Sequence, residues 1–529
     1  MKELKLEELT TRQKLGMAMI GHIWYSDDID GEANLEHALE LIRNHALGAV
    51  WMDPVGDNWK KAIATIKEVA DYPILIMTDA ENGLAGHYIG RHNSLGCTGS
   101  EELAYTFGKV TAVSARQMGY NTICNPVLDM VKGCGVCGLN ARSLGGNKYK
   151  VSELAIAIAR GMHDGGILTV AKHYPSAKGD VKIDSHMAES VSMATKEDLL
   201  DYYLYPYLQL MKHDLLDCIM TQHNRLPNID PDYPASLSKK VIGVIREQGF
   251  DGVALTDAMV MMGIAAKFGA RTSKGLAIEN GNDLVLTWGP VKDDYEAICE
   301  TYDKGLIDDE RLNEAVRRVL EAQHKTLKEP VYTELTQEDL EKIEKINRDS
   351  IYAHTDEGLE TPLSTDGKHF FVVLAPSEQE ISDQGKVHVD TMQKGWYRPG
   401  EIMEKLEKDF PNSKVMAINE FPTQVQNQRV LEQSVDYEDV VFITFVDSLA
   451  YVGRECLTSR IVSLIEALQV TKRVSTVVHF GNPFVLEELE HIPRVLIGCL
   501  ATASVNYALD VLAGKYPAKG VLTYDVHLK

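Results

Sequence analysis

The sequence predicts an α/β protein in which an N-terminal (β/α)8 TIM-type barrel is followed by a C-terminal α/β sandwich domain. Three observations support this prediction: the length of the chain, a regular alternation of apolar and amphipathic segments, and a break in that alternation after residue 330. One hydrophobic core rarely grows beyond about 250–300 residues, so a chain of 529 residues implies at least two domains.

The first part of the chain repeats one pattern, in which a short apolar segment is followed by polar residues and then by a helical stretch. Strand-then-helix alternation is typical of a parallel sheet, and eight such units favour a closed barrel over an open sheet. The expected strands are 15–21, 47–53, 74–79, 122–129, 167–173, 218–223, 253–257 and 284–288. Helices are expected at 58–69, 101–118, 151–163, 199–212, 238–248 and 310–325.

The remainder of the chain predicts a linker and a second, smaller sheet with helices on both faces. We expect the catalytic barrel at 1–330, a linker at 331–366 that includes a helix at 336–351, and the sandwich domain at 367–529. The strands expected in the second domain are 370–374, 415–418, 440–445, 475–480 and 494–499. Its expected helices are 402–409, 459–468 and 504–513.

Composition limits the classes of partner. The net charge of -23 would repel a phosphate backbone, so we expect no nucleic acid partner. No signal peptide or bilayer-spanning apolar run is recognisable, which predicts a cytoplasmic protein without a membrane partner. We expect a monomer or a homodimer, a choice that the sequence leaves open. The single C-x-x-C, Cys134 and Cys137, is weak as a zinc motif, and free thiols are the preferred interpretation. No dinucleotide or P-loop motif is present, so no cofactor or metal is expected.

Polar residues gather at the C-terminal ends of the expected strands, the rim that carries the active site in this type of barrel. Charged groups at the end of an apolar run are costly to bury without partners, so their convergence predicts a site. These residues are Asp79, Asp129, Lys172, His173, His223 and Asp257.

Two further features suggest proton transfer and a reactive carboxylate. A long polar loop after strand 167–173 contains Asp184 and His186, two residues apart, and a carboxylate can fix the tautomer and raise the basicity of an imidazole. Asp257 ends an apolar strand, where it could act as a nucleophile, a base or a metal ligand, or merely cap the next helix. These residues alone leave the alternatives open.

Taken together, the segments resemble glycoside hydrolase family 3, in its β-N-acetylhexosaminidase branch. The resemblance covers nearly the whole chain and keeps the order of the family's motifs. The matching segments are Met77–Gly83 (D-x-E-G-G), Asn125–Asp129 (A-P-V-x-D), Arg142–Gly145 (R-S-F-G), Lys172–Pro175 (K-H-F-P), Asp184–His186 (D-S-H), Met220–His223 (M-T-A-H), Pro234–Ser238 (P-A-T-L-S) and Gly252–Asp257, the nucleophile strand.

The resemblance implies a retaining hydrolase that removes terminal β-linked sugars from small carbohydrates. The expected substrates are in the first place β-N-acetylglucosaminides. Asp257 would be the nucleophile, and His186, oriented by Asp184, the general acid/base. The residues implied to line the sugar subsite are Asp79, Arg142, Lys172, His173 and His223.

Departures from the family pattern keep other functions open. Residues 176–179 replace the family's G-H-G and are one residue longer, Asn82 and Leu84 replace a Gly and an Arg, and Ala258 replaces an Asp. A β-glucosidase, a glycoside phosphorylase or a catalytically inactive carbohydrate-binding homologue would share the fold. A metal-dependent hydrolase is a further alternative, with ligands from His173, His186, His223 and Asp257.

Overall fold

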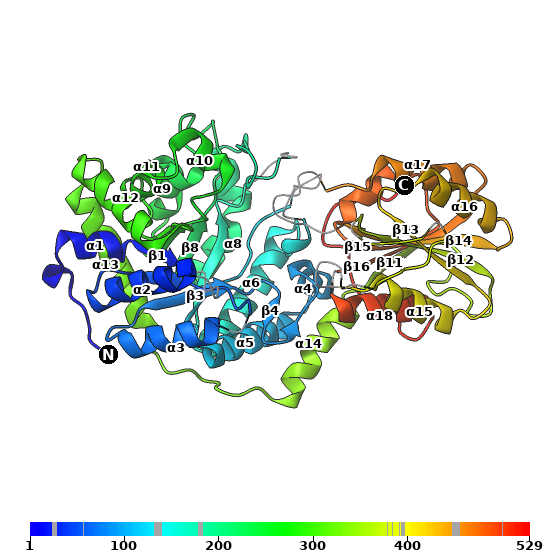
Figure 1. The fold of residues 1–529 in the computed structure, drawn as a ribbon, viewed down its shortest axis with the longest axis horizontal. Helices are drawn as coiled ribbons and strands as arrows, with labels where there is room; N and C mark the ends of the chain where they lie inside the picture. The colour runs from blue at the N-terminus through cyan, green and yellow to red at the C-terminus, as the bar shows by residue number, and fades with distance from the viewer. Residues whose placement is uncertain are drawn as a thin grey trace. The chain divides into compact units, whose positions relative to one another are not determined.

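A computed structural model describes residues 1–23, 29–56, 58–131, 140–177, 183–377, 379–382, 384–390, 392, 397–446, 455–499 and 501–529. The chain divides into two compact units, coloured in chain order in Figure 1. The first comprises Met1–His87, Glu101–Met130 and Asn147–Leu340, and the second comprises Tyr88–Ser100, Val131–Gly146 and Glu341–Lys529. Cys134 and Cys137 lie outside the described residues.

The first unit is the predicted barrel of eight parallel strands, so this part of the fold prediction is confirmed. The strands are β1 (Met19–His22), β2 (Ala49–Trp51), β3 (Leu75–Asp79), β6 (Thr122–Cys124), β7 (Leu168–Tyr174), β8 (Cys218–Thr221), β9 (Val253–Thr256) and β10 (Val285–Leu286). Their order is β10-β1-β2-β3-β6-β7-β8-β9, and a parallel bridge between Leu255 and Leu284 joins the two ends. The apolar side chains of these strands meet in one buried core.

Helices surround the barrel strands (Figure 1). They are α1 (Thr11–Met17), α2 (Ile29–Arg43), α3 (Trp59–Val69), α5 (Glu101–Met118), α6 (Lys148–Asp164), α7 (Lys196–Asp198), α8 (Tyr205–Lys212), α9 (Lys239–Glu247), α10 (Met262–Phe268), α11 (Thr272–Glu279), α12 (Val291–Asp303) and α13 (Asp309–Lys325). A short ribbon, β4 (Gly83–Leu84) with β5 (His87–Tyr88), follows β3.

Helix α13 illustrates why these stretches become helices against the barrel. Its N-cap, Asp308, accepts hydrogen bonds from the backbone N–H groups of Glu310 and Arg311, which have no partner within the helix. Leu312, Val316 and Val319 recur every three or four residues and are all buried, so one face of the helix covers the barrel.

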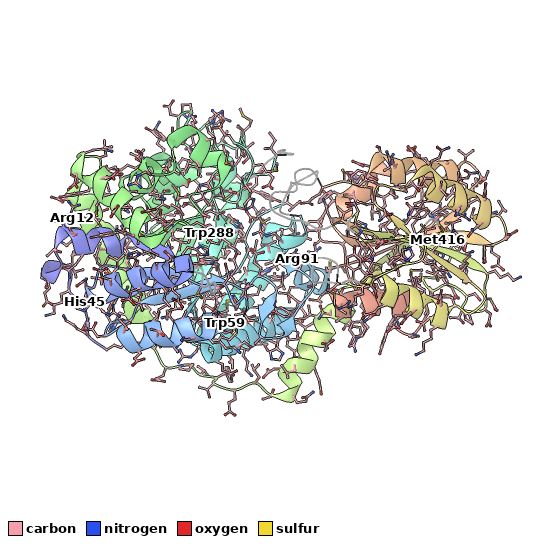
Figure 2. All side chains as sticks on the ribbon, in the orientation of Figure 1. Arg12, His45, Trp59, Arg91, Trp288 and Met416 are labelled. Carbon is pink, nitrogen blue, oxygen red and sulfur yellow. The ribbon has the colours of Figure 1, made fainter. Side chains whose placement is uncertain are left out.

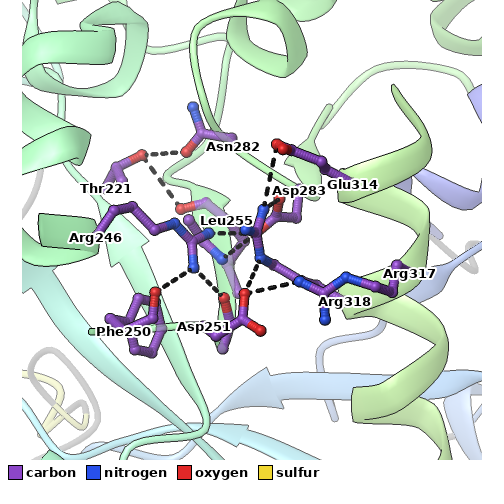
Figure 3. A network of polar contacts seen from close by, with 12 residues as sticks. Thr221, Arg246, Phe250, Asp251, Leu255, Asn282, Asp283, Glu314, Arg317 and Arg318 are labelled. Carbon is purple, nitrogen blue, oxygen red and sulfur yellow. Dashed lines mark hydrogen bonds and ion pairs between the residues drawn. The ribbon is translucent and has the colours of Figure 1, made fainter. Parts of the chain in front are cut away.

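The seam between β9 and β10 is held by one buried carboxylate, Asp283 (Figure 3). Its Oδ2 accepts hydrogen bonds from Ala254 N at 2.9 Å and from an Arg246 guanidinium nitrogen at 2.6 Å. Its Oδ1 accepts from Arg311 at 2.7 Å and from Arg318 at 3.2 Å. The Asp283 carboxylate therefore ties β9 to α9 and α13 at the point where the barrel closes.

Removing this carboxylate should destabilise the barrel strongly. In Asp283→Ala the Arg246 and Arg311 side chains lose a buried counter-charge, and breaking such a pair from one side typically costs about 3–5 kcal/mol. The free energy of unfolding, measured with a chemical denaturant, should fall by that amount. Asp303→Ala is a matched control, because the Arg12–Asp303 pair is 51% and 54% exposed and should contribute at most about 1 kcal/mol. Equal losses in the two variants would contradict the assignment.

The second unit is a six-stranded sheet with helices on both faces, which confirms the α/β sandwich predicted for the second domain. The strands are β11 (Tyr352–Thr355), β12 (His369–Ala375), β13 (Lys414–Asn419), β14 (Asp439–Val446), β15 (Val474–Gly481) and β16 (Arg494–Gly498), in the order β11-β16-β15-β14-β12-β13. Figure 1 shows α15 (Pro399–Asp409) and α18 (Thr502–Leu512) on one face, and α16 (Gln424–Ser434) and α17 (Ser459–Gln469) on the other. Each face buries its own apolar core.

Two parts of the second unit differ from the sequence expectation. The range 331–366 contains α14 (Gln337–Asp349), which was expected as a helix, but also β11, which pairs antiparallel with β16. The unit also includes α4 (His92–Thr98) and the turn Asn140–Arg142, which come from loops between barrel strands. The Asn347 side chain accepts a hydrogen bond from the Gly90 N–H and donates one to the Tyr88 carbonyl. The Tyr524 hydroxyl donates a hydrogen bond to the Ser143 carbonyl.

A buried histidine in this sheet should make the second unit sensitive to acid. Both ring nitrogens of His479 are bonded in the neutral form: Nε2 donates to the Asn482 carbonyl at 2.8 Å, and Nδ1 accepts from the Thr444 hydroxyl at 2.8 Å. Burial lowers the pKa of His479 to about 4, and its hydrogen bond to Asn482 offsets this only in part. The charged form is therefore disfavoured in the folded protein.

As the pH falls from about 6.5 to about 4, the unfolded chain binds a proton at His479 that the folded chain does not, so the free energy of unfolding should decrease. The decrease from this group should reach about 3 kcal/mol at the acid end and be absent above pH 7. Comparing wild type with His479→Gln between pH 7.5 and 4.5 isolates the effect, because the other titrating groups are shared. A difference that does not change with pH would refute it.

None of the helices that the structure describes is both long and apolar enough to cross a membrane.

Candidate active site

The C-terminal ends of β3 and β7 are joined by a buried ammonium group. Lys172 is fully buried, and its Nζ lies 2.5 Å from Asp79 Oδ1 and 2.7 Å from Glu81 Oε1. Two carboxylates compensate the buried charge, as burial requires. The Asp79 side chain remains 48% exposed and the Glu81 side chain only 8%, so Asp79 is the carboxylate of this trio that a ligand can reach.

The neighbouring His173 is oriented by the loop that follows β6. Its Nδ1 lies 2.5 Å from Oδ2 of Asp129, whose side chain is inaccessible to solvent. The pairing of β7 with β8 is irregular between Lys172 and Tyr174, so His173 interrupts the regular alternation of the strand. Asp129 was among the rim residues expected from the sequence, and the structure assigns it to this histidine.

His223, which follows β8, is bonded through both ring nitrogens. Its Nε2 donates to the Ala258 carbonyl at 3.0 Å, and its Nδ1 accepts from the Ser236 hydroxyl at 2.7 Å. Asn282 donates to the Ser236 carbonyl at 2.7 Å and accepts from the Thr221 hydroxyl at 2.8 Å. His223 therefore holds the backbone next to Asp257.

Asp257 follows β9 and is half-buried at the centre of this group. Its backbone N–H bonds Thr221 O at 2.9 Å, and its Oδ1 accepts from the Ala258 N–H at 2.8 Å. Burial favours the neutral carboxyl, but the electrostatic influence of His173, His223 and His186 and the hydrogen bond from the Ala258 N–H outweigh it, so the pKa of Asp257 lies well below its ordinary value. Asp257 is therefore a carboxylate at neutral pH.

Asp184 and His186 form the pair expected from their spacing. Asp184 Oδ1 lies 2.7 Å from His186 Nδ1 and also accepts the His186 backbone N–H at 2.9 Å. The Asp184 side chain is 2% exposed and the His186 side chain 24%, so the buried carboxylate presents an accessible ring. Residues 178–182, in the preceding part of the loop, lie outside the described residues.

The loop that carries His186 rests on the segment that follows Asp257. Met262 N–H donates to the His186 carbonyl at 3.0 Å. A Cβ on Gly263 would lie 2.7 Å from Ser185 O and 2.8 Å from Ala188 O, distances too short for a side chain. The absence of a side chain at Gly263 thus lets the two segments approach each other.

Three residues of the predicted set, His173, His186 and His223, are close enough to Asp257 to lower its pKa. Asp184 joins them through His186, and Asp79 pairs with Lys172, the residue before His173. Arg142 ends the short turn Asn140–Arg142 and belongs to the second unit, so its place at a sugar subsite stays a prediction. Among the described residues, no group of three or more His, Cys, Asp and Glu side chains is arranged to hold a metal ion.

Sequence reasoning overlooked three residues that build this site. Glu81 stood within the D-x-E motif, and its spacing from Asp79 was the available signal. Ser236 lay within the matched P-A-S-L-S segment, but its bond to His223 depends on tertiary contacts. Asn282 carried no local signal, because its partners lie 46 and 61 residues away in the chain.

Chemically, the arrangement offers an ionised carboxylate beside an imidazole that a second carboxylate orients. A carboxylate of this kind can act as a nucleophile, and the paired imidazole can donate and accept a proton at neutral pH. Lys172, Asp79 and His173 add donors and acceptors suited to a polar ligand with several hydroxyl groups.

Several known proteins resemble this chain in sequence or in fold. The β-hexosaminidase of Tolumonas auensis is 28% identical over 263 residues, which is 47% of this chain and 77% of that protein. The β-hexosaminidase of Hydrogenovibrio crunogenus is 32% identical over 215 residues, which is 40% of this chain and 59% of that protein. A glycoside hydrolase family 3 β-N-acetylglucosaminidase from Paenibacillus sp. str. FPU-7 superposes with a TM-score of 0.80 at 24% identity, covering 98% of this chain and 100% of that one.

The family assignment rests on the barrel. The sequence model of the glycosyl hydrolase family 3 N-terminal domain matches residues 12–322, more than half of the chain. The matched range contains β1 to β10 and every described side chain of the site around Asp257. The chain therefore belongs to glycosyl hydrolase family 3 and is, as a member of that family, a glycoside hydrolase.

Proposed function

We propose that the protein is a retaining glycosidase that removes terminal β-linked sugars from small carbohydrates, with β-N-acetylglucosaminides as its preferred substrates. The observation that carries this proposal is the low-pKa carboxylate of Asp257 surrounded by three histidines, one of which is paired with a buried aspartate. The names of the β-hexosaminidase relatives support the choice of sugar.

In the first step, the Asp257 carboxylate attacks the anomeric carbon while the bond to the leaving oxygen breaks. His186 gives its Nε2 proton to that oxygen, so the aglycone leaves as a neutral alcohol and the sugar stays bound to Asp257 as an ester. In the second step, His186 takes a proton from water, the resulting hydroxide displaces Asp257, and the sugar is released with its original configuration. Protons and charges are thus restored after each turnover.

Asp184 determines which ring nitrogen of His186 carries the transferred proton. Because Nδ1–H of His186 donates to Asp184 at 2.7 Å, the proton that moves is on Nε2. The carboxylate also stabilises the imidazolium form of His186, which is present before the first step and is formed again in the second. In this scheme Asp79, Lys172 and His173 bind the hydroxyl groups of the sugar, and Arg142 does so by family resemblance. His223 is a positioning residue, since it holds Ala258.

Asp257→Ala should reduce turnover of aryl β-N-acetylglucosaminides by roughly 10³-fold or more, since no other group would form the ester. The decisive measurement is the intact mass after incubation with an activated fluorinated glycoside. Wild type should gain the mass of one glycosyl group and Asp257→Ala none, with both proteins showing the same thermal unfolding. Labelling of a folded Asp257→Ala protein would show that a residue other than Asp257 is the nucleophile.

Gly263→Ala should displace the loop that carries His186, because the added methyl group would meet the carbonyls of Ser185 and Ala188. A displacement of this order can cost about 10²-fold in rate. The loss should be greatest for substrates with poor leaving groups, which depend on protonation, and His186→Ala should share this dependence. Gly243→Ala is the matched control, since nothing lies within 4 Å of its Cβ position.

Equal losses for good and poor leaving groups in Gly263→Ala would show that this glycine acts on stability or sugar binding rather than through His186. A Gly263→Ala enzyme indistinguishable from Gly243→Ala would show that the loop position does not limit turnover.

A second candidate function is a glycoside phosphorylase, which the histidine acid/base specifically favours. After protonating the leaving group, His186 is neutral and would not repel an incoming phosphate as a carboxylate base would. Phosphate would then attack the anomeric carbon in place of water and yield a glycosyl phosphate. Assaying product formation with and without phosphate separates the two: a glycosyl phosphate indicates phosphorolysis, and the free sugar alone indicates hydrolysis.

A further inference from the structure

The ends of β10, β1 and β2 carry a cluster of aromatic and acidic side chains that the proposed mechanism does not use. This cluster, called here the Trp–Asp patch, consists of His22, Trp51, Asp53 and Trp288. His22 and Trp51 end β1 and β2, and Asp53 and Trp288 follow β2 and β10 by two residues each. All four are therefore on the same C-terminal rim of the barrel as Asp79 and Asp257.

The aromatic side chains of the Trp–Asp patch are stacked. The rings of His22 and Trp288 are 3.9 Å apart between centroids and only 9° from parallel, and Trp51 packs against Trp288 at 5.7 Å. Trp288 is half-buried and labelled in the barrel unit in Figure 2. Its φ of 64° is unfavourable for a bulky residue, and such strain persists only where the surroundings impose it and is concentrated at functional sites.

Asp53 is an oriented carboxylate that stays accessible. Its Oδ1 accepts from the Trp51 indole N–H at 3.0 Å and from the Thr78 hydroxyl at 3.4 Å, and its Oδ2 lies 3.7 Å from His22 Nε2. The Asp53 side chain nevertheless remains 41% exposed. Partial burial raises the pKa of Asp53, but its bonds to His22 and Trp51 outweigh burial, so the group is ionised at neutral pH.

The Trp–Asp patch is continuous with the proposed active site on two sides. Trp51 pairs with Met77, so the residues two positions later, Asp53 and Asp79, follow adjacent strands at the same level. On the other side, Trp288 and Ala258 pack against the same barrel core, and Ala258 is next to Asp257. A ligand bound between Asp79 and Asp257 would thus lie beside the patch.

We propose that the Trp–Asp patch completes the binding site of the transferred sugar: Asp53 accepts hydrogen bonds from sugar hydroxyls and Trp288 packs against an apolar C–H face of the ring. This inference rests on the proposed glycosidase function and extends it to specificity. A sugar presents hydroxyls at its edge and C–H groups on its faces, which matches a carboxylate beside an aromatic surface. Hydrogen bonds to an ionised acceptor are the strong ones, so Asp53 would select which hydroxyls the sugar must carry.

The test compares kcat/KM of wild type, Asp53→Asn and Trp288→Leu on aryl β-glycosides that share one leaving group. Losing a hydrogen bond to a charged group should lower kcat/KM roughly 10- to 100-fold in Asp53→Asn. The factor should be the same for good and poor leaving groups, and it should vanish on the monodeoxy glycoside that lacks the bonded hydroxyl. Trp288→Leu should lower kcat/KM for all of the glycosides.

Two controls match these substitutions away from the rim. Asp71→Asn removes an exposed aspartate that pairs with His45 at 2.8 Å, and Trp59→Phe replaces a buried tryptophan on α3. Both should keep the wild-type kcat/KM, and thermal unfolding should show that every variant is folded.

Three outcomes would overturn the inference: wild-type kcat/KM in Asp53→Asn, a loss that no monodeoxy substrate removes, or a loss that depends on the leaving group. Absence of turnover in wild type would instead refute the proposed function. In that case the role of the Trp–Asp patch is tested by measuring the binding of free N-acetylglucosamine and of glucose by calorimetry. Weaker binding in Asp53→Asn than in wild type would support the inference, and unchanged or undetectable binding would reject it.

Discussion

The barrel depends on one closing contact, the parallel bridge between Leu255 of β9 and Leu284, which directly precedes β10, next to the buried carboxylate of Asp283. Two short strands contribute few backbone hydrogen bonds at this seam, and the Asp283 carboxylate adds bonds to Ala254 and to three arginines from two helices. The buried negative charge of Asp283 is tolerated because both of its carboxylate oxygens accept hydrogen bonds, most of them from positively charged arginines. Because Asp257 follows β9 directly, the same contact positions the proposed nucleophile.

In the site, too, buried ionisable side chains are paired with partners of opposite or complementary character. Lys172 is neutralised by Asp79 and Glu81, His173 is oriented by Asp129, and His186 by Asp184. Each pair fixes a side chain that would otherwise rotate, so the orientation of the reactive groups is established before a ligand binds. Asp257 differs from these residues: its ionised form is favoured by three surrounding histidines and one backbone N–H rather than by a single counter-ion.

Sequence patterns located most of the barrel strands closely because they are short apolar runs, several of which end at a polar residue. The segment expected at 253–257 became β9, Val253–Thr256, whereas the one expected at 15–21 covers the end of α1 and the start of β1. The elements that were overlooked lack this signal. Strand β11 is only partly buried at the edge of its sheet, and α16 is largely polar, with few buried residues. The role of His223 in the sugar subsite, implied by the family resemblance, stays a prediction; its hydrogen bonds add a contact with the backbone beside Asp257 that no sequence pattern indicates.

By itself the sequence determined the repeating strand–helix units, the polar residues at the strand ends and the short-range pair of Asp184 and His186, because these features depend on residues close together in the chain. Only the tertiary structure decided the partners of Asp283, the network from Asn282 through Ser236 to His223, and the grouping of His22 and Asp53 with Trp288. These contacts join residues from different strands and helices. They are created by strand register and by closure of the barrel, which no local pattern of residues encodes.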